Sequence, residues 1–134
     1  MSKEIGIKAE HFFADLLNKA KLNFEYTDDW YDFLVENKHK VEVKSCMIST
    51  SNGNNKKEKK NKRIGRFYFT SNENSERQYK ENIWICLVVR NIQQYMIIGF
   101  LRAEQINKKR YLSIHQANNL KLISFEQWLS EVAK

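Results

Sequence analysis

The sequence predicts a single α/β domain, and three patterns along the chain support this expectation. Apolar residues recur at spacings of three and four over residues 3–21, apolar and polar residues alternate over residues 30–45, and residues 83–90 and 94–101 are rich in β-branched and aromatic types. The first pattern is typical of an amphipathic helix and the other two of strands. A length of 134 residues, with 42% hydrophobic and 29% charged residues, fits one domain over residues 1–134 with its own core.

The N-terminal helix, over residues 3–21, is expected to bury one stripe of apolar side chains. The stripe consists of Ile5, Ala9, Phe12, Phe13, Leu16, Leu17 and Ala20. Asn23 follows at a position where a residue in the left-handed conformation can end a helix. A short strand is therefore expected over residues 24–27.

A β-hairpin is predicted next, because the odd positions 33, 35, 41 and 43 are apolar and residues 36–40 are polar. A turn over residues 37–39 places Leu34 opposite Glu42, and Asp32 opposite Lys44. The odd residues then share one apolar face. The even face collects Asp32, Glu42 and Lys44, which is a costly set of charges for a strand unless those groups have a function.

Residues 46–63 contain few apolar side chains and are expected to form a flexible loop. Residues 56–63 carry six basic residues and one acidic residue, a net charge of +5 within a formal total of +7 for the chain. Such a segment attracts polyanions, although a loop that only improves solubility is the alternative. The residues expected to contact a nucleic-acid backbone are Lys56, Lys57, Lys59, Lys60, Lys62, Arg63 and Arg66.

A short strand is expected over residues 66–70. Its alternation directs Phe67 and Phe69 to the core and Tyr68 outward, where Tyr68 could stack on unpaired bases. A helix capped by Ser71 or Asn72 should follow and reach about residue 82.

The C-terminal half is expected to add two strands and a helix. The strands cover residues 83–90 and 94–101, and Gly99 in the second predicts a bulge or a close backbone approach. Residues 124–127 resemble a capping box, which predicts a last helix to about residue 133.

Composition limits the compartment and the partners. The longest apolar runs, over residues 83–89 and 95–101, are too short to cross a membrane, and the first residues lack the apolar stretch of a signal peptide. Cys46 and Cys86 lack the close spacing of a zinc or redox motif, so both are expected to be reduced, with Cys86 in the core. We expect a soluble cytoplasmic protein with no membrane partner, and a pI near 9.4 favours nucleic acid as the partner.

The chemically informative string is Asp32, nine intervening residues, and then Glu42-Val43-Lys44. Carboxylate oxygens can hold Mg²⁺ against a phosphodiester, the carbonyl of Val43 can add a further oxygen ligand, and a nearby cation can stabilise developing negative charge. Glu10 lies at the boundary of the first helix's apolar stripe, from which it can reach a site. The alternatives for the first ligand are Asp28 and Asp29, because the hairpin register is open.

These residues carry a family resemblance. Gly6-Ile7-Lys8-Ala9-Glu10 on a first helix, followed by Asp32 and then by Glu42-Val43-Lys44-Ser45, resembles the PD-(D/E)XK nuclease superfamily, with archaeal Holliday-junction resolvases as the most similar type. The chain departs from the family pattern at Tyr31, where the name-giving proline would stand, and residues 77–79 lack the glutamine and tyrosine spacing of one family branch.

The resemblance implies a restriction-endonuclease-like fold, in which a mixed central sheet with flanking helices has an α-β-β-β-α-β core. It also implies that Asp32 and Glu42 are metal ligands, that Lys44 is the catalytic lysine, and that Glu10 is an accessory acidic residue. The cofactor would be Mg²⁺, for which Mn²⁺ can substitute.

The sequence therefore predicts a metal-dependent endonuclease that acts on DNA, with RNA as a further possible substrate and a homodimer as a possible assembly. The main alternative is a catalytically inactive nucleic-acid-binding module of the same fold, and a third is an interaction protein with a chance motif. Metal-dependent cleavage separates the first from both others, and salt-sensitive binding without cleavage separates the second from the third.

Overall fold

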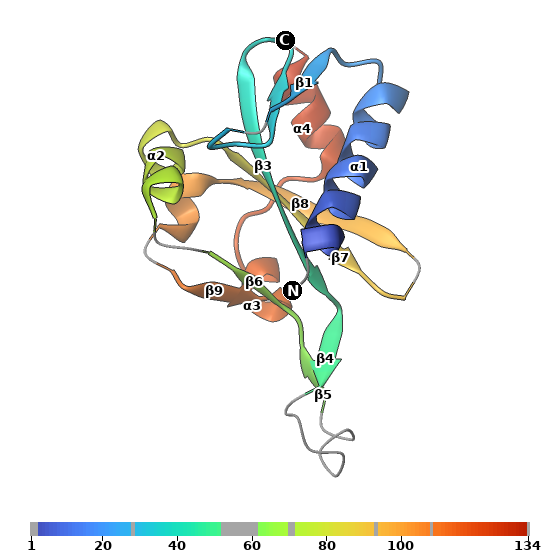
Figure 1. The fold of residues 1–134 in the computed structure, drawn as a ribbon, viewed down its shortest axis with the longest axis vertical. Helices are drawn as coiled ribbons and strands as arrows, with labels where there is room; N and C mark the ends of the chain where they lie inside the picture. The colour runs from blue at the N-terminus through green and yellow to red at the C-terminus, as the bar shows by residue number, and fades with distance from the viewer. Residues whose placement is uncertain are drawn as a thin grey trace.

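The computed structural model describes residues 3–27, 29–51, 62–69, 72–92, 94–107 and 109–133. Helices flank a mixed five-stranded sheet, and two smaller two-stranded ribbons accompany it (Figure 1). The elements in chain order are α1 (Lys3–Lys19), β1 (Phe24–Tyr26), β2 (Phe33–Val35), β3 (His39–Met47), β4 (Ser49–Ser51), β5 (Lys62–Ile64), β6 (Arg66–Tyr68), α2 (Glu73–Glu81), β7 (Trp84–Arg90), β8 (Tyr95–Arg102), the 3₁₀ helix η2 (Ala103–Ile106), β9 (Tyr111–Ser113), α3 (Ile114–Asn118) and α4 (Phe125–Val132).

The five-stranded sheet has the order β1-β2-β3-β7-β8. Strands β1, β2 and β3 form an antiparallel meander, and β7 lies parallel to β3 after a crossover that contains α2. Strand β8 then pairs antiparallel with β7. The run α1-β1-β2-β3-α2-β7 is the predicted α-β-β-β-α-β core, so the predicted fold class is confirmed.

Each face of the sheet has its own apolar core. On one face, Phe13 and Leu17 of α1 pack with Phe33, Val41 and the Trp128 ring of α4. Ala9, Phe13 and Leu17 of the predicted stripe are therefore buried as expected, and Phe12 packs against the same core. Cys86 is also fully buried in this core and has no disulfide partner.

The core on the other face is built from β7, β8 and the short C-terminal elements. Ile85 and Leu87 of β7 pack there against Leu101, Phe67 and Ile106. Because β7 has a core on both sides, its residues 84–89 are all buried. Cys46 lies in this second core as a free thiol.

The hairpin forms, but its predicted register was wrong. Leu34 lies opposite Lys40 rather than Glu42, because the turn occupies residues 36–38 instead of 37–39. Glu36 and Asn37 both adopt positive φ in this turn, at 53° and 57°. The change shifts each pairing by two residues, so the even residues still share one face, and Asp32 is level with Glu42 rather than with Lys44.

The segment expected to be a loop over residues 46–63 has regular structure at both ends. Strand β3 continues to Met47, and β4 pairs antiparallel with β5. Residues 52–61, which include Lys56, Lys57, Lys59 and Lys60, lie outside the described residues.

Local signals further along the chain are confirmed. Asn72 caps α2 and Ser124 caps α4, each in a capping box. The β7–β8 register shifts next to Gly99, where a Cβ atom would lie 2.6 Å from the Leu122 Cβ. The 3₁₀ helix, β9 and α3 were not predicted.

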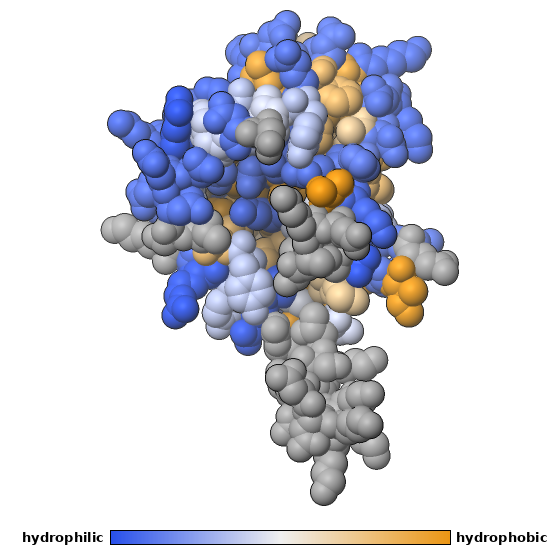
Figure 2. All heavy atoms as spheres, in the orientation of Figure 1, coloured by the Kyte–Doolittle hydropathy of each residue, from blue (hydrophilic) through white to orange (hydrophobic). Residues whose placement is uncertain are grey.

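The surface is mostly polar. Figure 2 shows hydrophilic residues over much of the visible face, with hydrophobic residues in small separate areas. Within the described ranges, no helix is both long enough and apolar enough to cross a membrane.

Gly65 fixes the place where the β4–β5 ribbon returns to the body of the protein. Its N–H donates to the Ile48 carbonyl at 2.9 Å, and a Cβ atom at Gly65 would lie 1.7 Å from the Met47 carbonyl oxygen. A Cβ atom cannot be accommodated unless the backbone moves, because the colliding atom belongs to the main chain.

We therefore expect Gly65→Ala to destabilise the fold by roughly 1–3 kcal/mol or more, measured as a lower midpoint of thermal unfolding. Gly6→Ala is the matched control. Gly6 lies in α1 with no atom within 4 Å of its Cβ position, so alanine there should stabilise the helix by roughly 0.5–1 kcal/mol. A Gly65→Ala protein as stable as the wild type would contradict the packing described here.

Candidate active site

Backbone contacts fix the turn between β1 and β2, which carries Asp32. The Asp32 N–H donates to the Val41 carbonyl at 3.1 Å, and the Asp32 carbonyl accepts from the Thr27 N–H at 2.8 Å. The Asp32 side chain then turns toward β3, where its Oδ2 accepts from the Val43 N–H at 2.8 Å. Asp32 thus lies beside β3, immediately before the first residue of β2.

Glu42 and Lys44 lie two positions apart on β3 and project from the same face of the sheet. Their charged groups form an ion pair, with 3.5 Å between the Lys44 Nζ and the Glu42 Oε2. The Lys44 and Glu42 side chains are only 23% and 15% exposed. This ion pair therefore lies in a partly enclosed position that a small ion or a phosphate group can still reach.

The carbonyl of Val43 belongs to the same place. In a strand, the N–H and C=O of one residue point toward the same neighbouring strand. The Val43 N–H points to the Asp32 carboxylate, so the Val43 carbonyl is directed to the same side of β3. This carbonyl is therefore directed to the side of β3 on which Asp32 lies, just before β2 begins.

Glu10 approaches from α1. Its Oε2 accepts from the Tyr26 hydroxyl at 3.1 Å, and its carboxyl group is hydrogen-bonded to that of Asp32. Within the described residues, no group of three or more His, Cys, Asp and Glu side chains is arranged to hold a metal ion. Asp32 thus contacts the Val43 N–H and influences the pKa values of its neighbours Glu10 and Glu42.

The carboxyl groups resist ionisation. Burial, followed by the charge of Glu42, raises the pKa of Asp32 to about 7. Burial, followed by the charge of Asp32, raises the pKa of Glu10 to about 7. Burial also raises the pKa of Glu42, although the Lys44 ammonium opposes that change. The cluster would gain from a positive charge placed among its oxygens.

Gln78 on α2 contacts this site, and the sequence pattern did not predict its contact. Its Nε2 donates to the Trp30 carbonyl at 2.8 Å, and its amide also hydrogen-bonds the Glu42 carboxylate. Ser75 and Gln78 are the buried residues of α2, although both are polar. An available signal was that residues 73–81 form a helix without an apolar stripe, so the buried side of this helix must carry polar groups.

Trp30 anchors the Asp32 turn from the other side. Its ring lies between two cations, with the Arg77 guanidinium carbon 4.4 Å and the Lys40 Nζ 5.0 Å from the ring centroid. Asp29, a rival for the first ligand, is exposed, and Asp28 lies outside the described residues.

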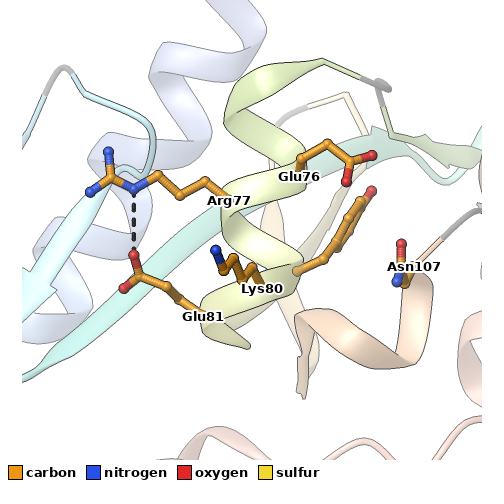
Figure 3. A pocket seen from close by; sticks show the side chains of 6 residues that line it. Glu76, Arg77, Lys80, Glu81 and Asn107 are labelled. Carbon is orange, nitrogen blue, oxygen red and sulfur yellow. Dashed lines mark hydrogen bonds and ion pairs between the residues drawn. The ribbon is translucent and has the colours of Figure 1, made fainter.

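A separate pocket of about 660 Å³ lies on the outer side of α2 and does not include the carboxylate cluster. Figure 3 shows Arg77 paired with Glu81 along this helix, with an Arg77 Nε to Glu81 Oε2 distance of 3.4 Å. The pocket is lined by Glu76, Arg77, Tyr79, Lys80, Glu81 and Asn107. Its mixed charges give it no preference for an anion or a cation.

The predicted nucleic-acid contacts are described only in part. Lys62 and Arg63 lie in β5, where only the backbone is described. Arg66 on β6 is described in full, and its guanidinium carbon lies 4.4 Å from the centroid of the Tyr111 ring.

Comparison with known proteins gives one match. No curated protein and no solved structure matches the chain. The family model described as the PD-(D/E)XK nuclease superfamily domain matches residues 1–119, a range that contains the carboxylate cluster, Lys44 and Gln78. With most of its length matched and the α-β-β-β-α-β core in place, the chain belongs to the PD-(D/E)XK nuclease superfamily.

Proposed function

We propose that this protein is a metal-dependent endonuclease that hydrolyses phosphodiester bonds in DNA. The observation that carries the proposal is the placement of Asp32 against the Val43 N–H, next to the Glu42–Lys44 ion pair on the same strand. Membership of a nuclease superfamily makes phosphodiester hydrolysis the expected chemistry for this arrangement.

The oxygen donors fit a hard divalent cation. Asp32 and Glu42 are partly buried carboxylates whose pKa values are raised, and the Val43 carbonyl is a neutral oxygen directed to the same side. Mg²⁺ prefers a site with one or two carboxylates, and Mn²⁺ accepts similar ligands. When bound, such an ion supplies Lewis-acid polarisation of the phosphate and activation of water.

The remaining residues have distinct tasks. Lys44 keeps its ammonium 3.5 Å from Glu42, where it can stabilise the negative charge that develops on the phosphate oxygens. Glu10 shares a hydrogen bond with the Asp32 carboxyl and so orients Asp32 toward β3. Gln78 links Glu42 to the Trp30 carbonyl and so connects Glu42 with the turn that carries Asp32.

Phosphate binding is assigned to a different part of the chain. The basic residues that we propose as contacts to the DNA backbone are Lys56, Lys57, Lys59, Lys60, Lys62, Arg63 and Arg66. An inactive binding module of the same fold is the alternative. The partly buried carboxylates disfavour this alternative. They repel phosphate and destabilise the fold, and a protein that only binds nucleic acid would gain no affinity from them.

Cleavage of labelled DNA in Mg²⁺ tests the proposed site. Asp32→Asn and Glu42→Gln should each lower the cleavage rate by about 100-fold or more, because the loss of one ligand removes several kcal/mol of transition-state stabilisation. Lys44→Met should lose a similar factor while metal binding persists. EDTA should abolish cleavage by the wild type.

Asp29→Asn is the matched control, because Asp29 is an exposed acid three positions before Asp32. It should cleave at the wild-type rate. Binding of the Asn and Gln variants to DNA should stay within about twofold of wild type, since phosphate contacts lie elsewhere. Cleavage near the wild-type rate by Asp32→Asn or Glu42→Gln at saturating Mg²⁺ would remove that residue from the proposed site.

The raised pKa of Asp32 predicts a pH-dependent effect on stability. The folded protein holds a proton on Asp32 up to about pH 7, whereas the unfolded chain releases it near pH 3.8. Folding stability from this group is therefore present at low pH and is lost as the pH rises toward 7. In EDTA, Asp32→Asn should raise the thermal midpoint above that of wild type at pH 8, and the difference should shrink as the pH falls and vanish only below about pH 4.

Addition of Mg²⁺ at pH 8 extends this measurement. The ion should raise the midpoint of the wild type and have little effect on Asp32→Asn, because binding to the folded state stabilises it. If Asp32→Asn were less stable than wild type at pH 8 in EDTA, the carboxylate would be a structural group rather than a strained ligand.

Neutralisation of the basic segment tests phosphate binding. Replacing the six basic residues of 56–63 with glutamine should weaken binding and flatten its salt dependence. Each lost phosphate contact lowers the magnitude of the slope of log affinity against log salt by about 0.9 on duplex DNA. Neutralisation of Lys19, Lys21 and Lys121, which are exposed on other elements, is the control. An unchanged slope in the first variant would mean that the segment does not contact DNA.

A further inference from the structure

The small ribbon formed by β6 and β9 has one buried face and one outward face. Its antiparallel register pairs Phe67 with Leu112 and Tyr68 with Tyr111. Phe67 and Leu112 are almost fully buried, whereas Tyr68 is 55% and Tyr111 is 40% exposed. The outward face therefore presents two tyrosine rings side by side.

Arg66 extends this row of rings. Its guanidinium carbon lies 4.4 Å from the Tyr111 centroid, and the Tyr111 and Tyr68 centroids are 6.1 Å apart with the rings inclined by 50°. Three planar groups thus follow one another across the ribbon. We call Arg66, Tyr111 and Tyr68 the stacking row.

The charge around the stacking row has one sign. Residues 66–69 and 109–113 contain Arg66, Lys109 and Arg110 and no acidic residue. Lys109 and Arg110 are exposed. Flat aromatic surface within a basic surround is the combination that binds single-stranded nucleic acid, because the bases stack on the rings and the cations attract the phosphates.

The stacking row is also connected to the candidate active site. Phe69 follows Tyr68 directly, and the Lys44 Nζ lies 6.0 Å from the Phe69 ring centroid. The Phe69 N–H donates to the Arg110 carbonyl at 3.0 Å, which fixes this junction against the β9 side. The residue that directly follows Tyr68 in the chain therefore lies beside the Lys44 ammonium.

We propose that the stacking row binds unpaired bases of the nucleic-acid substrate, so that the enzyme selects substrates with a single-stranded portion. This inference rests on the proposed nuclease function and adds the substrate class to it. Duplex DNA keeps its bases stacked inside the helix and cannot use this surface, whereas a single strand, flap or bulge can.

Binding in EDTA tests the proposal without any cleavage. The probes are a fluorescein-labelled single-stranded DNA of 20 nucleotides, its duplex and the RNA of the same sequence, each followed by fluorescence anisotropy at one fixed salt concentration. Tyr68→Leu should weaken single-strand binding about tenfold and change duplex binding by less than about twofold. Tyr68→Phe retains the ring and should bind as wild type does. Equal loss on the DNA and RNA strands is expected, since every base has a stacking face.

Two further variants separate stacking from charge and from general damage. Arg66→Lys keeps the charge but loses the planar group, so it should weaken single-strand binding without changing the salt slope. Ile92→Ser is the surface control. Ile92 is 88% exposed in the turn between β7 and β8, which lies on the opposite side of the view in Figure 1 from β6 and β9. Thermal unfolding of every variant checks that the ribbon remains folded.

A base analogue gives a direct readout. A 2-aminopurine in the single strand should lose fluorescence on binding to wild type and to Tyr68→Phe, but not to Tyr68→Leu. Unchanged single-strand affinity in Tyr68→Leu, or an equal loss on single strand and duplex, would overturn the stacking row and leave the nuclease proposal intact. If the wild type bound and cleaved no nucleic acid of any form, the nuclease proposal itself would fail.

Discussion

The start of β2 at Phe33 is the constraint on which the candidate site depends. Strand β3 continues to Met47, so beyond Val41 it has no strand on that side to receive its N–H and C=O groups. A main-chain N–H that is shielded from water and has no hydrogen-bond acceptor would lower the free energy of unfolding. The Asp32 carboxylate accepts from the Val43 N–H and so takes the place of the missing strand. The same arrangement directs the Val43 carbonyl toward the two carboxylates, which concentrates oxygen atoms at one point.

The period of two along β3 explains how one strand serves both packing and chemistry. Its odd residues face the α1 core, and its even residues carry Glu42 and Lys44 toward α2. This separation of faces was predictable from the sequence. The predicted turn position was wrong, but the assignment of residues to the two faces was not affected. The turn lies one residue earlier than expected, which moves each pairing by two residues and leaves every side chain on its predicted face. The partners changed, with Asp32 level with Glu42 rather than Lys44 and Leu34 opposite Lys40 rather than Glu42.

The parts that the sequence did not predict depend on contacts that local patterns do not encode. Strand β9 and helix α3 are short, and they form because Phe67 and Leu112 share a core with Ile106. Gln78 is the clearest case within the site. A glutamine on a polar helix is ordinarily exposed. Here the α2 crossover between β3 and β7 brings that helix over the even face of β3, and only this tertiary placement directs the Gln78 amide to Glu42 and Trp30.

The proposed catalytic residues and the proposed stacking row lie on different elements of the fold. The carboxylate cluster lies at the central sheet, whose strand β7 is buried on both faces. Local unfolding of such a sheet requires a large part of the free energy of global unfolding, so the geometry of the cluster is stable. The proposed stacking row lies on the β6–β9 ribbon, outside the central sheet. A catalytic geometry needs to be accurate to a fraction of an ångström, whereas a stacking surface tolerates different bases and backbone shapes. Substitutions on the β6–β9 ribbon can therefore alter which nucleic acid is bound, while Asp32, Glu42 and Lys44 keep their positions.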